Sequence, residues 1–337
     1  MKKGRGTKLI FTGLLLFCVV AFCVGMCFGR YPLSVPELLQ VLGSRVLKTE
    51  MTWSKNVDNV VWAIRLPRMC AAFLVGAGLA LSGATYQGIF QNPLVSPDLL
   101  GVSAGACVGA SIAILCQMPS GMIQLLAFGG GIAAVGLTNL VPVFFHNKSN
   151  LMLVLAGIIV SGFFNSAQGL LKYVADPDTQ LAQITYWTMG SLAKTNVSGV
   201  LSITPVMLIA MGVLLFLRWR INLLAIGEAE AHALGVQVGK LRGISIICAT
   251  VLTASSICVA GTVGWIGLVI PHLGRLLVGT DNKHLLPASL LMGGGFLMLI
   301  DTCARNLSGS EVPLSILTGF IGTPVFLWLM IRQRAKV

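Results

Sequence analysis

The sequence predicts an all-α, polytopic membrane protein in which about ten transmembrane helices form one compact bundle over residues 1–337. Three observations support this fold class. Hydrophobic residues make up 55% of the positions, charged residues make up only 10%, and the mean hydropathy is +0.87. Roughly a quarter of the residues in an average soluble domain are charged. Because a soluble domain attached to one anchor helix would dilute the mean hydropathy towards zero, the apolar residues must recur in many spans.

A helix needs about 20 apolar residues to cross a hydrocarbon core of roughly 30 Å. The hydropathy pattern indicates ten such spans, near residues 9–28, 66–89, 99–117, 122–145, 151–172, 200–217, 243–260, 263–279, 285–304 and 313–331. The segments between them combine charge with Pro, Gly, Asn or Asp, as turns require. Ten spans leave no room for a sizeable aqueous domain, so we expect a single transmembrane domain.

The first span follows the basic segment MKKGRGTK. This beginning is similar to a signal peptide, but its apolar run of about 20 residues exceeds the usual 7 to 15 and no A-x-A-like site follows. We therefore interpret residues 9–28 as a retained membrane helix.

The second and third spans carry small residues four positions apart. Gly76, Ala80 and Ala84 form one such set, and a second set contains Gly101, Gly105 and Gly109. Small residues at this spacing let another helix approach closely. We favour packing within one subunit over a subunit interface.

The outer end of the second span carries the motif IRLPR at 64–68. Arg65 and Arg68 would lie at the positive end of a helix beginning at residue 66, where each cation costs about 0.3–1 kcal/mol. An acidic partner outside the chain, or lipid phosphates, would compensate. Arg305, at the end of the ninth span on the same face, would complete a basic rim.

The longest inner connection, residues 218–242, contains the sequence GEAEAHALGV. Its residues Glu228 to Leu234 favour a short helix, and Gly235 is typical of a helix end. Acidic residues suit the amino end of such a helix. An acidic segment on a basic surface suggests a docking site, and a solvated connector is the alternative.

The distribution of charge predicts the orientation of the bundle. With the amino terminus on the inner side, fourteen of the 23 basic and four of the 11 acidic residues lie inside, which gives net charges of +10 inside and +2 outside. This satisfies the positive-inside rule. We expect both termini on the cytoplasmic side of a bacterial or archaeal membrane.

Several kinds of chemistry lack a motif in this chain. No ionisable residue falls near the centre of a predicted span, which disfavours an ion-coupled carrier. The string GVQVGKL at 235–241 has neither the spacing nor the hydroxyl of a P-loop. The nine cysteines lie in apolar runs without a CxxC pair, and the four histidines form no HExxH motif. We expect no enzyme activity, no bound cofactor and no metal site.

Residues 65–106, 261–279 and 322–330 give the sequence a resemblance to the FecCD-type permeases of ABC importers for iron-siderophores, haem and vitamin B12. The resemblance implies the type II importer architecture, in which two ten-helix subunits form a pore. It also implies two cytoplasmic ATPase subunits that carry ATP-Mg, and an extracytoplasmic substrate-binding protein. The second permease would be another copy or a homologue.

The resemblance also implies roles for particular residues. Arg65, Arg68 and Arg305 would meet carboxylates of the binding protein, and residues 180–192 would contribute an outer gate. Ser149 and Asn150 match the family's cytoplasmic constriction. The segment that would couple to the ATPases consists of Glu228, Ala229, Glu230, Ala231, His232, Ala233, Leu234 and Gly235.

The predicted function is therefore import of an iron complex or a related metal chelate by alternating access, driven by partner ATPases. We rank the candidate substrates by how often they occur in this family, with an iron-siderophore first, haem second and cobalamin third. Molybdate-type oxyanions also stay open as substrates. Two alternatives remain from other classes, an ion-coupled secondary transporter of a small solute and a membrane assembly protein that transports nothing.

Overall fold

The computed structural model describes residues 2–47, 53–146, 149–224 and 228–334, and within these ranges it contains helices and no strand. The predicted all-α class is confirmed. The elements are α1 (Lys2–Cys27), α2 (Val35–Leu47), α3 (Lys55–Asn59), η1 (Val60–Arg65), α4 (Leu66–Ile89), η2 (Pro97–Leu100), α5 (Val102–Leu115), α6 (Ser120–Phe144), α7 (Asn150–Val174), α8 (Gln180–Met189), α9 (Val197–Leu224), α10 (Glu228–Ala233), α11 (Val238–Ala260), α12 (Ile266–Val278), α13 (Asn282–Asn306) and α14 (Leu314–Arg334).

Each predicted span has a helix at its position, but two of these helices are short. Among the described residues, eight helices are long and apolar enough to cross a membrane, whereas α5 and α12 have 14 and 13 residues. Both begin after irregular backbone. Gly101 before α5 has a φ of +83°, and Trp265 before α12 has a φ of +69°. At about 1.5 Å per residue, neither helix spans the hydrocarbon core alone.

The second span begins earlier than the sequence predicts. Helix α3, the π-helical turn η1 and α4 follow one another without a break, so the apolar helical segment runs from Lys55 to Ile89. Leu66 donates its backbone N–H to the carbonyl of Val61, five residues earlier. Pro67 has no N–H to donate, and the wider π turn lies directly before it. Arg65 is therefore almost three turns inside the helix, and the predicted cost of a cation at its amino end does not apply.

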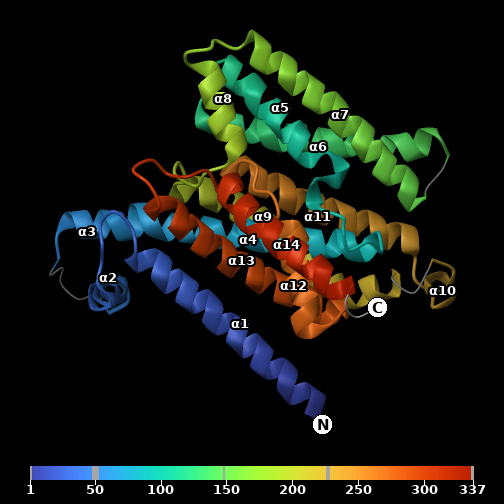
Figure 1. The fold of residues 1–337 in the computed structure, drawn as a ribbon, viewed down its shortest axis with the longest axis horizontal. Coiled ribbons are helices and arrows are strands. Elements are labelled where there is room, and N and C mark those ends of the chain that lie inside the picture. Colours follow the sequence, from blue (N-terminus) through green and yellow to red (C-terminus); the bar gives the residue numbers. More distant parts are fainter. Residues whose placement is uncertain (1, 48–52, 147–148, 225–227, 335–337) are drawn as a thin grey trace.

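Helix α4 is the centre of the bundle and packs against α9, α11, α12 and α13 (Figure 1). Glycines bring these backbones together. A Cβ on Gly76 would lie 2.2 Å from the carbonyl oxygen of Gly293 in α13, and one on Gly83 would lie 1.9 Å from that of Gly267 in α12. In the same way, a Cβ on Gly109 of α5 would lie 2.0 Å from the carbonyl oxygen of Leu126 in α6. The predicted packing of the small-residue stripes within one subunit is confirmed.

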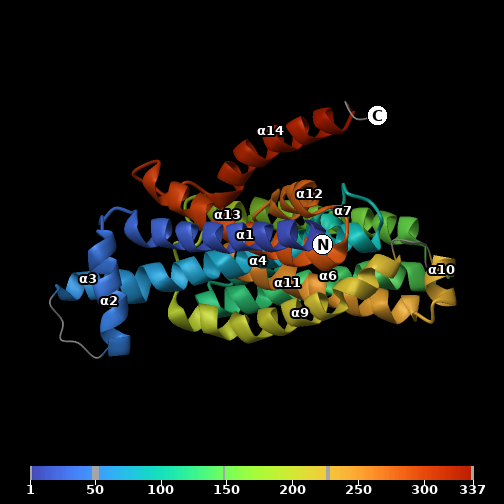
Figure 2. The same ribbon diagram turned by 90° about the horizontal axis from the view of Figure 1, so that it is seen from below.

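The two ends of the bundle carry different elements. Helices α2 and α3 lie at one end, and α10 lies at the other (Figures 1 and 2). The amino end of α1 points towards the end that carries α10 (Figure 1). Helix α14 stands away from the rest of the bundle over most of its length (Figure 2). The side chains of Phe320, Leu327 and Trp328 on α14 are 76%, 59% and 51% exposed.

Candidate functional site

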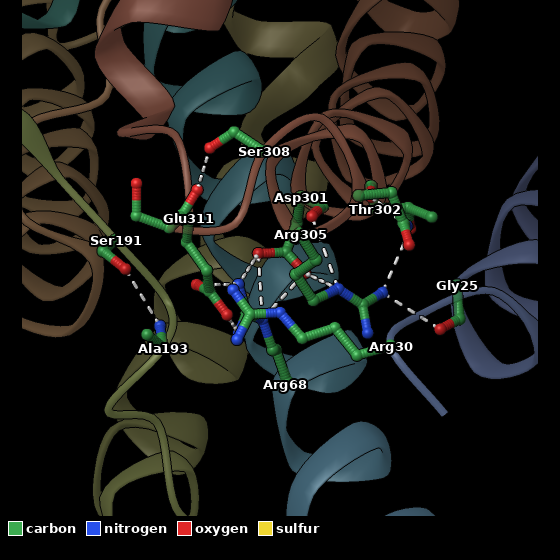
Figure 3. A network of polar contacts seen from close by, with 12 residues as sticks. Gly25, Arg30, Arg68, Ser191, Ala193, Asp301, Thr302, Arg305, Ser308 and Glu311 are labelled. Carbon is green, nitrogen blue, oxygen red and sulfur yellow. Dashed lines mark hydrogen bonds and ion pairs between the residues drawn. The ribbon is translucent and has the colours of Figure 1, made fainter. Parts of the chain in front are cut away.

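An ionic cluster joins α4 and α13 at the end of the bundle opposite α10 (Figure 3). The guanidinium Nε of Arg68 lies 3.0 Å from both carboxylate oxygens of Asp301, and its Nη2 donates to Oδ1 at 2.8 Å. Two further N–H groups of Arg68 donate to Oε1 and Oε2 of Glu311, each at 2.8 Å. Arg68 thus clamps two carboxylates, and the Glu311 pair has the parallel, bidentate geometry of strong ion pairs.

Arg305 completes the cluster from one turn further along α13. Its Nε lies 3.3 Å from Oδ2 of Asp301, and its Nη2 donates to the backbone oxygen of Gly25 at 3.0 Å and to the Thr302 hydroxyl at 3.2 Å. Asp301 is fully buried, and Arg68 and Arg305 are 5% and 8% exposed. Two cations and two carboxylates therefore neutralise each other at this end of the bundle, and Arg305 fastens α1 to α13.

Arg65 is also buried, but it binds backbone instead of carboxylates. Its guanidinium donates to the carbonyl oxygens of Met26, Cys27 and Tyr31. These oxygens belong to the end of α1 and the segment that follows it, where the helix leaves carbonyl groups without partners. Arg65 thus closes the carboxyl end of α1 onto the helix that contains η1.

The structure corrects one part of the predicted basic rim. Arg65, Arg68 and Arg305 do gather at one end, but the compensating acids come from the chain itself and not from outside it. The sequence interpretation missed Asp301 and Glu311. The signal was present, because Asp301 and Arg305 are four residues apart on one helix, the spacing of an intrahelical ion pair. The role of the three arginines in docking stays a prediction.

Glu311 is the accessible acid of this cluster, with 29% of its side chain exposed. Burial alone would raise the pKa of its carboxyl. Hydrogen bonds and positive charge from Arg68 outweigh that effect, so the pKa lies below its usual value. Arg30, which is exposed, adds a further positive charge and donates to the backbone oxygen of Gly309. Glu311 and Arg30 are therefore the charged side chains at this cluster that a partner could reach.

Helix α10 lies at the opposite end, packed against α9 and α11. It ends in a Schellman motif, in which Val236 donates its N–H to the carbonyl of Ala231 and Gly235 donates to that of His232. Gly235 has a φ of +78°, which strains any residue with a Cβ. Ala231 is fully buried, whereas Glu230, His232 and Leu234 are exposed. The side chains of Glu228 and Ala229 lie outside the described residues.

The predicted cytoplasmic gate lies where α7 begins. The Ser149 hydroxyl accepts a hydrogen bond from the backbone N–H of Met152 at 3.2 Å, the geometry of a helix N-cap. The Oδ1 atom of Asn150 is buried and has no hydrogen-bond partner within the described ranges. The predicted outer gate, residues 180–192, corresponds largely to α8. Both gates stay predictions.

Neutral polar groups occupy the middle of the bundle. Tyr86 and Thr250 share a hydroxyl hydrogen bond of 2.8 Å, and Ser82 and Thr253 share another of 2.8 Å, both between α4 and α11. In the described helices, Asp, Glu, Lys and Arg lie within about two turns of a helix end, apart from the arginines of the α3, η1 and α4 segment. Proton- and sodium-coupled carriers use charged groups at this depth.

Comparisons with known proteins agree over nearly the whole chain. Residues 16–332 match the model of the FecCD transport family. The molybdate import system permease protein MolB of Haemophilus influenzae is 41% identical over 97% of this chain and 96% of its own length. An iron chelatin transport system permease protein of Helicobacter pylori is 39% identical over 95% of this chain and 98% of its own length. The hemin transport system permease protein HmuU of Yersinia pestis is 35% identical over 99% and 98%.

A solved structure has the same fold. It is described as an inward-facing conformation of a metal-chelate type ABC transporter, and its TM-score is 0.86 at 39% sequence identity. The match covers 96% of this chain and 99% of that one.

Proposed function

The chain belongs to the FecCD transport family and is a multi-pass membrane permease of an ABC importer, and from this premise we propose that it forms half of a pore for a metal chelate. The second half would be another copy or a homologous permease. We assign that contact to α14 and α7, whose exposed apolar side chains can pack against a second permease as well as against lipid. Both termini would lie in the cytoplasm, as the +10 inner and +2 outer charges favour.

We propose that the chain has no ATPase site of its own, binds no cofactor, and couples to two cytoplasmic ATPase subunits that bind ATP-Mg. Helix α10 is the docking element. Its side chains Glu230, His232 and Leu234 are exposed, and the Schellman motif fixes the backbone at its carboxyl end. Because α10 packs against α9 and α11, a displacement of α10 by an ATPase subunit would be transmitted to these two helices. ATP binding would close the ATPase pair, and α7 and α14 would then exchange outward and inward openings. Such coupling requires contacts that differ between the two states.

The substrate-binding protein would dock at the opposite end, over the cluster of Arg68, Asp301, Arg305 and Glu311. Glu311 already holds two N–H groups of Arg68. A carboxylate on the binding protein would therefore pair with the exposed Arg30 and not with Arg68. Charge reversal at Arg30 tests this contact without disturbing the buried pairs. Arg30→Glu is expected to weaken association of the binding protein and to leave ATPase assembly intact, and unchanged association would contradict the proposal.

The substrate would be an iron complex, either a siderophore or haem, or a related chelate such as cobalamin. The observation that carries this proposal is the full-length match to the FecCD family, supported by the metal-chelate transporter of the same fold. Molybdate is a second candidate, because a relative with 41% identity is a molybdate permease. A pathway of neutral side chains fits both, since a wall that bound the substrate tightly would not release it. Affinity can instead reside in the binding protein.

Reconstitution tests the class of transporter. Proteoliposomes that contain the permease, its ATPase and the loaded binding protein should accumulate substrate only when ATP is supplied. Transport driven by an ion gradient without the ATPase would support a secondary carrier and overturn the proposal. Absence of substrate-dependent ATP hydrolysis in the complete assembly would support the assembly-protein alternative.

Mass spectrometry of the ligand that co-purifies with the binding protein separates the two substrate candidates. An iron chelate, haem or cobalamin would support the first, and molybdate would support the second.

A further inference from the structure

A groove of about 480 Å³ lies between helices α1, α9 and α13. Three elements that are far apart in the sequence form it, namely the amino-terminal part of α1, the last turns of α9 and the first turns of α13. Its lining residues are Thr7, Lys8, Phe11, Thr12, Leu15, Arg218, Lys283, His284 and Pro287. The functions proposed above use none of them.

The polar part of the groove is cationic. Lys8, Arg218 and Lys283 each come from a different helix, and none of them forms an ion pair within 4.0 Å among the residues that the structure describes. The nearby carboxylate, Asp281, is already engaged. It accepts hydrogen bonds from Asn222 and from the backbone of Lys283, and it lies 3.5 Å from His284. The groove therefore presents three cations, and Asp281, which lies next to Lys283 and His284, is not among its lining residues.

The apolar lining residues are Phe11, Leu15 and Pro287, and they lie deeper along the helices than the cations, with the Thr12 hydroxyl among them. Lys8 and Leu15 are seven residues apart on α1, which separates them by about 10 Å along the helix axis. Phe11 lies between them, and Pro287 lies one turn beyond Lys283 on α13. Leu15 is 55% exposed, on a helix of which only 22% of the apolar window is buried inside the protein. The groove thus changes from charged to apolar in the direction that leads into the membrane.

We propose that this groove binds an anionic phospholipid, with the phosphate between Lys8, Arg218 and Lys283 and an acyl chain along Phe11 and Leu15. Basic pockets between transmembrane helices at the membrane surface suit acidic lipid headgroups. A free phosphate ion would satisfy the same cations but would leave the apolar half of the groove uncovered. A soluble protein would not reach Leu15. The groove is cationic at its entrance and carries apolar side chains deeper along the helices, which matches a lipid that is anionic at one end and apolar at the other.

A bound lipid would join three helices at one point. Helix α1 packs mainly on α13, and α9 packs on α11, α4 and α13. A phosphate held by Lys8, Arg218 and Lys283 would connect the ends of α1, α9 and α13 and offset the mutual repulsion of the three cations. The lipid would thus brace these three helices near the carboxyl end of α9.

Native mass spectrometry of the purified full chain in detergent tests this proposal. The probes are dioleoyl phosphatidylglycerol, dioleoyl phosphatidylcholine and inorganic phosphate. Wild-type protein should retain phosphatidylglycerol in preference to phosphatidylcholine, and inorganic phosphate should not displace it. The variant Lys8→Gln, Arg218→Gln, Lys283→Gln should bind phosphatidylglycerol about a hundredfold more weakly, since each of the three cations near an anionic headgroup contributes about fivefold.

A matched control removes three charges elsewhere at the same end. The variant Arg220→Gln, Lys240→Gln, Arg332→Gln changes exposed residues outside the groove lining. It should keep its affinity within about twofold. The charge-preserving variant Lys8→Arg, Arg218→Lys, Lys283→Arg should also retain the lipid. This result would show that the glutamine variant loses the lipid through loss of charge and not through misfolding.

Three results would overturn the proposal. The first is equal retention of the two lipids by wild-type protein, and the second is equal loss in the groove and control variants. The third is displacement of the lipid by inorganic phosphate, which would make the groove a site for a free anion.

Discussion

Removal of the Asp301 charge should destabilise the protein through its two buried arginines. In wild-type protein Asp301 is fully buried between Arg68, at 2.8 Å, and Arg305, at 3.3 Å. The substitution Asp301→Asn keeps the size of the side chain but leaves two guanidinium groups with only Glu311 to balance them. Removing one partner of a buried ion pair costs about 3–5 kcal/mol, because an uncompensated charge remains in a medium of low polarity.

Thermal unfolding of the purified chain in detergent measures this loss. At about 2 °C per kcal/mol for a chain of this size, Asp301→Asn should lower the Tm by about 6–10 °C. Glu311→Gln provides the comparison, because it removes a carboxylate from the same cluster at a position where 29% of the side chain is exposed. Its loss should be about 1–2 kcal/mol, or about 2–4 °C.

A second substitution distinguishes charge balance from lost packing. Asp301→Asn combined with Arg305→Gln removes one charge of each sign and leaves the bidentate pair of Arg68 with Glu311 in place. The double variant should therefore be more stable than Asp301→Asn alone. The reasoning is refuted if the two losses add, or if Asp301→Asn lowers the Tm no more than Glu311→Gln does.

Three further predictions follow from other parts of the molecule. Gly293→Ala should destabilise the chain by at least about 2 kcal/mol in thermal unfolding, because its Cβ would meet the Gly76 oxygen at 2.3 Å, whereas Gly136→Ala, with open space around it, should be neutral or stabilising by up to about 1 kcal/mol. Equal Tm values for these two variants would contradict the role of the glycine contact. Because the Glu311 pKa is lowered on folding, its ionised form stabilises the fold above its unfolded pKa near 4.5, and this contribution is lost as the pH falls through the lower folded value. The Tm difference between wild-type and Glu311→Gln protein should therefore shrink from pH 6 to pH 3, and a constant difference would exclude this linkage. Gly235→Val should strain the end of α10 by about 1–2 kcal/mol and reduce substrate-stimulated ATP hydrolysis in the complete assembly, whereas Gly239→Ala, a substitution into open space, should not; identical stimulation in both would argue against α10 as the coupling element.

The sequence predicted the positions of most helices because membrane spans leave a local signal. An apolar run of about 20 residues has few alternatives to a helix, since lipid offers no partners for backbone groups. The end of α10 at Gly235 was also readable, because a Schellman motif requires a residue that tolerates a positive φ. The start of the second span could not be predicted from the sequence in the same way. The residues before 66 are mixed in polarity, and only their packing in the bundle makes Lys55 to Ile89 one segment.

By itself, the sequence determined the fold class and the gathering of arginines at one end, because composition and local spacing carry these properties. Only the tertiary structure decided what the arginines bind. Arg68 and Asp301 are 233 positions apart, and no local pattern pairs them. Helices α4 and α13 approach closely where Gly76 meets Gly293, and this contact brings the two side chains within hydrogen-bond distance. The charged groove of α1, α9 and α13 arises in the same way, from residues that become neighbours only when the bundle closes.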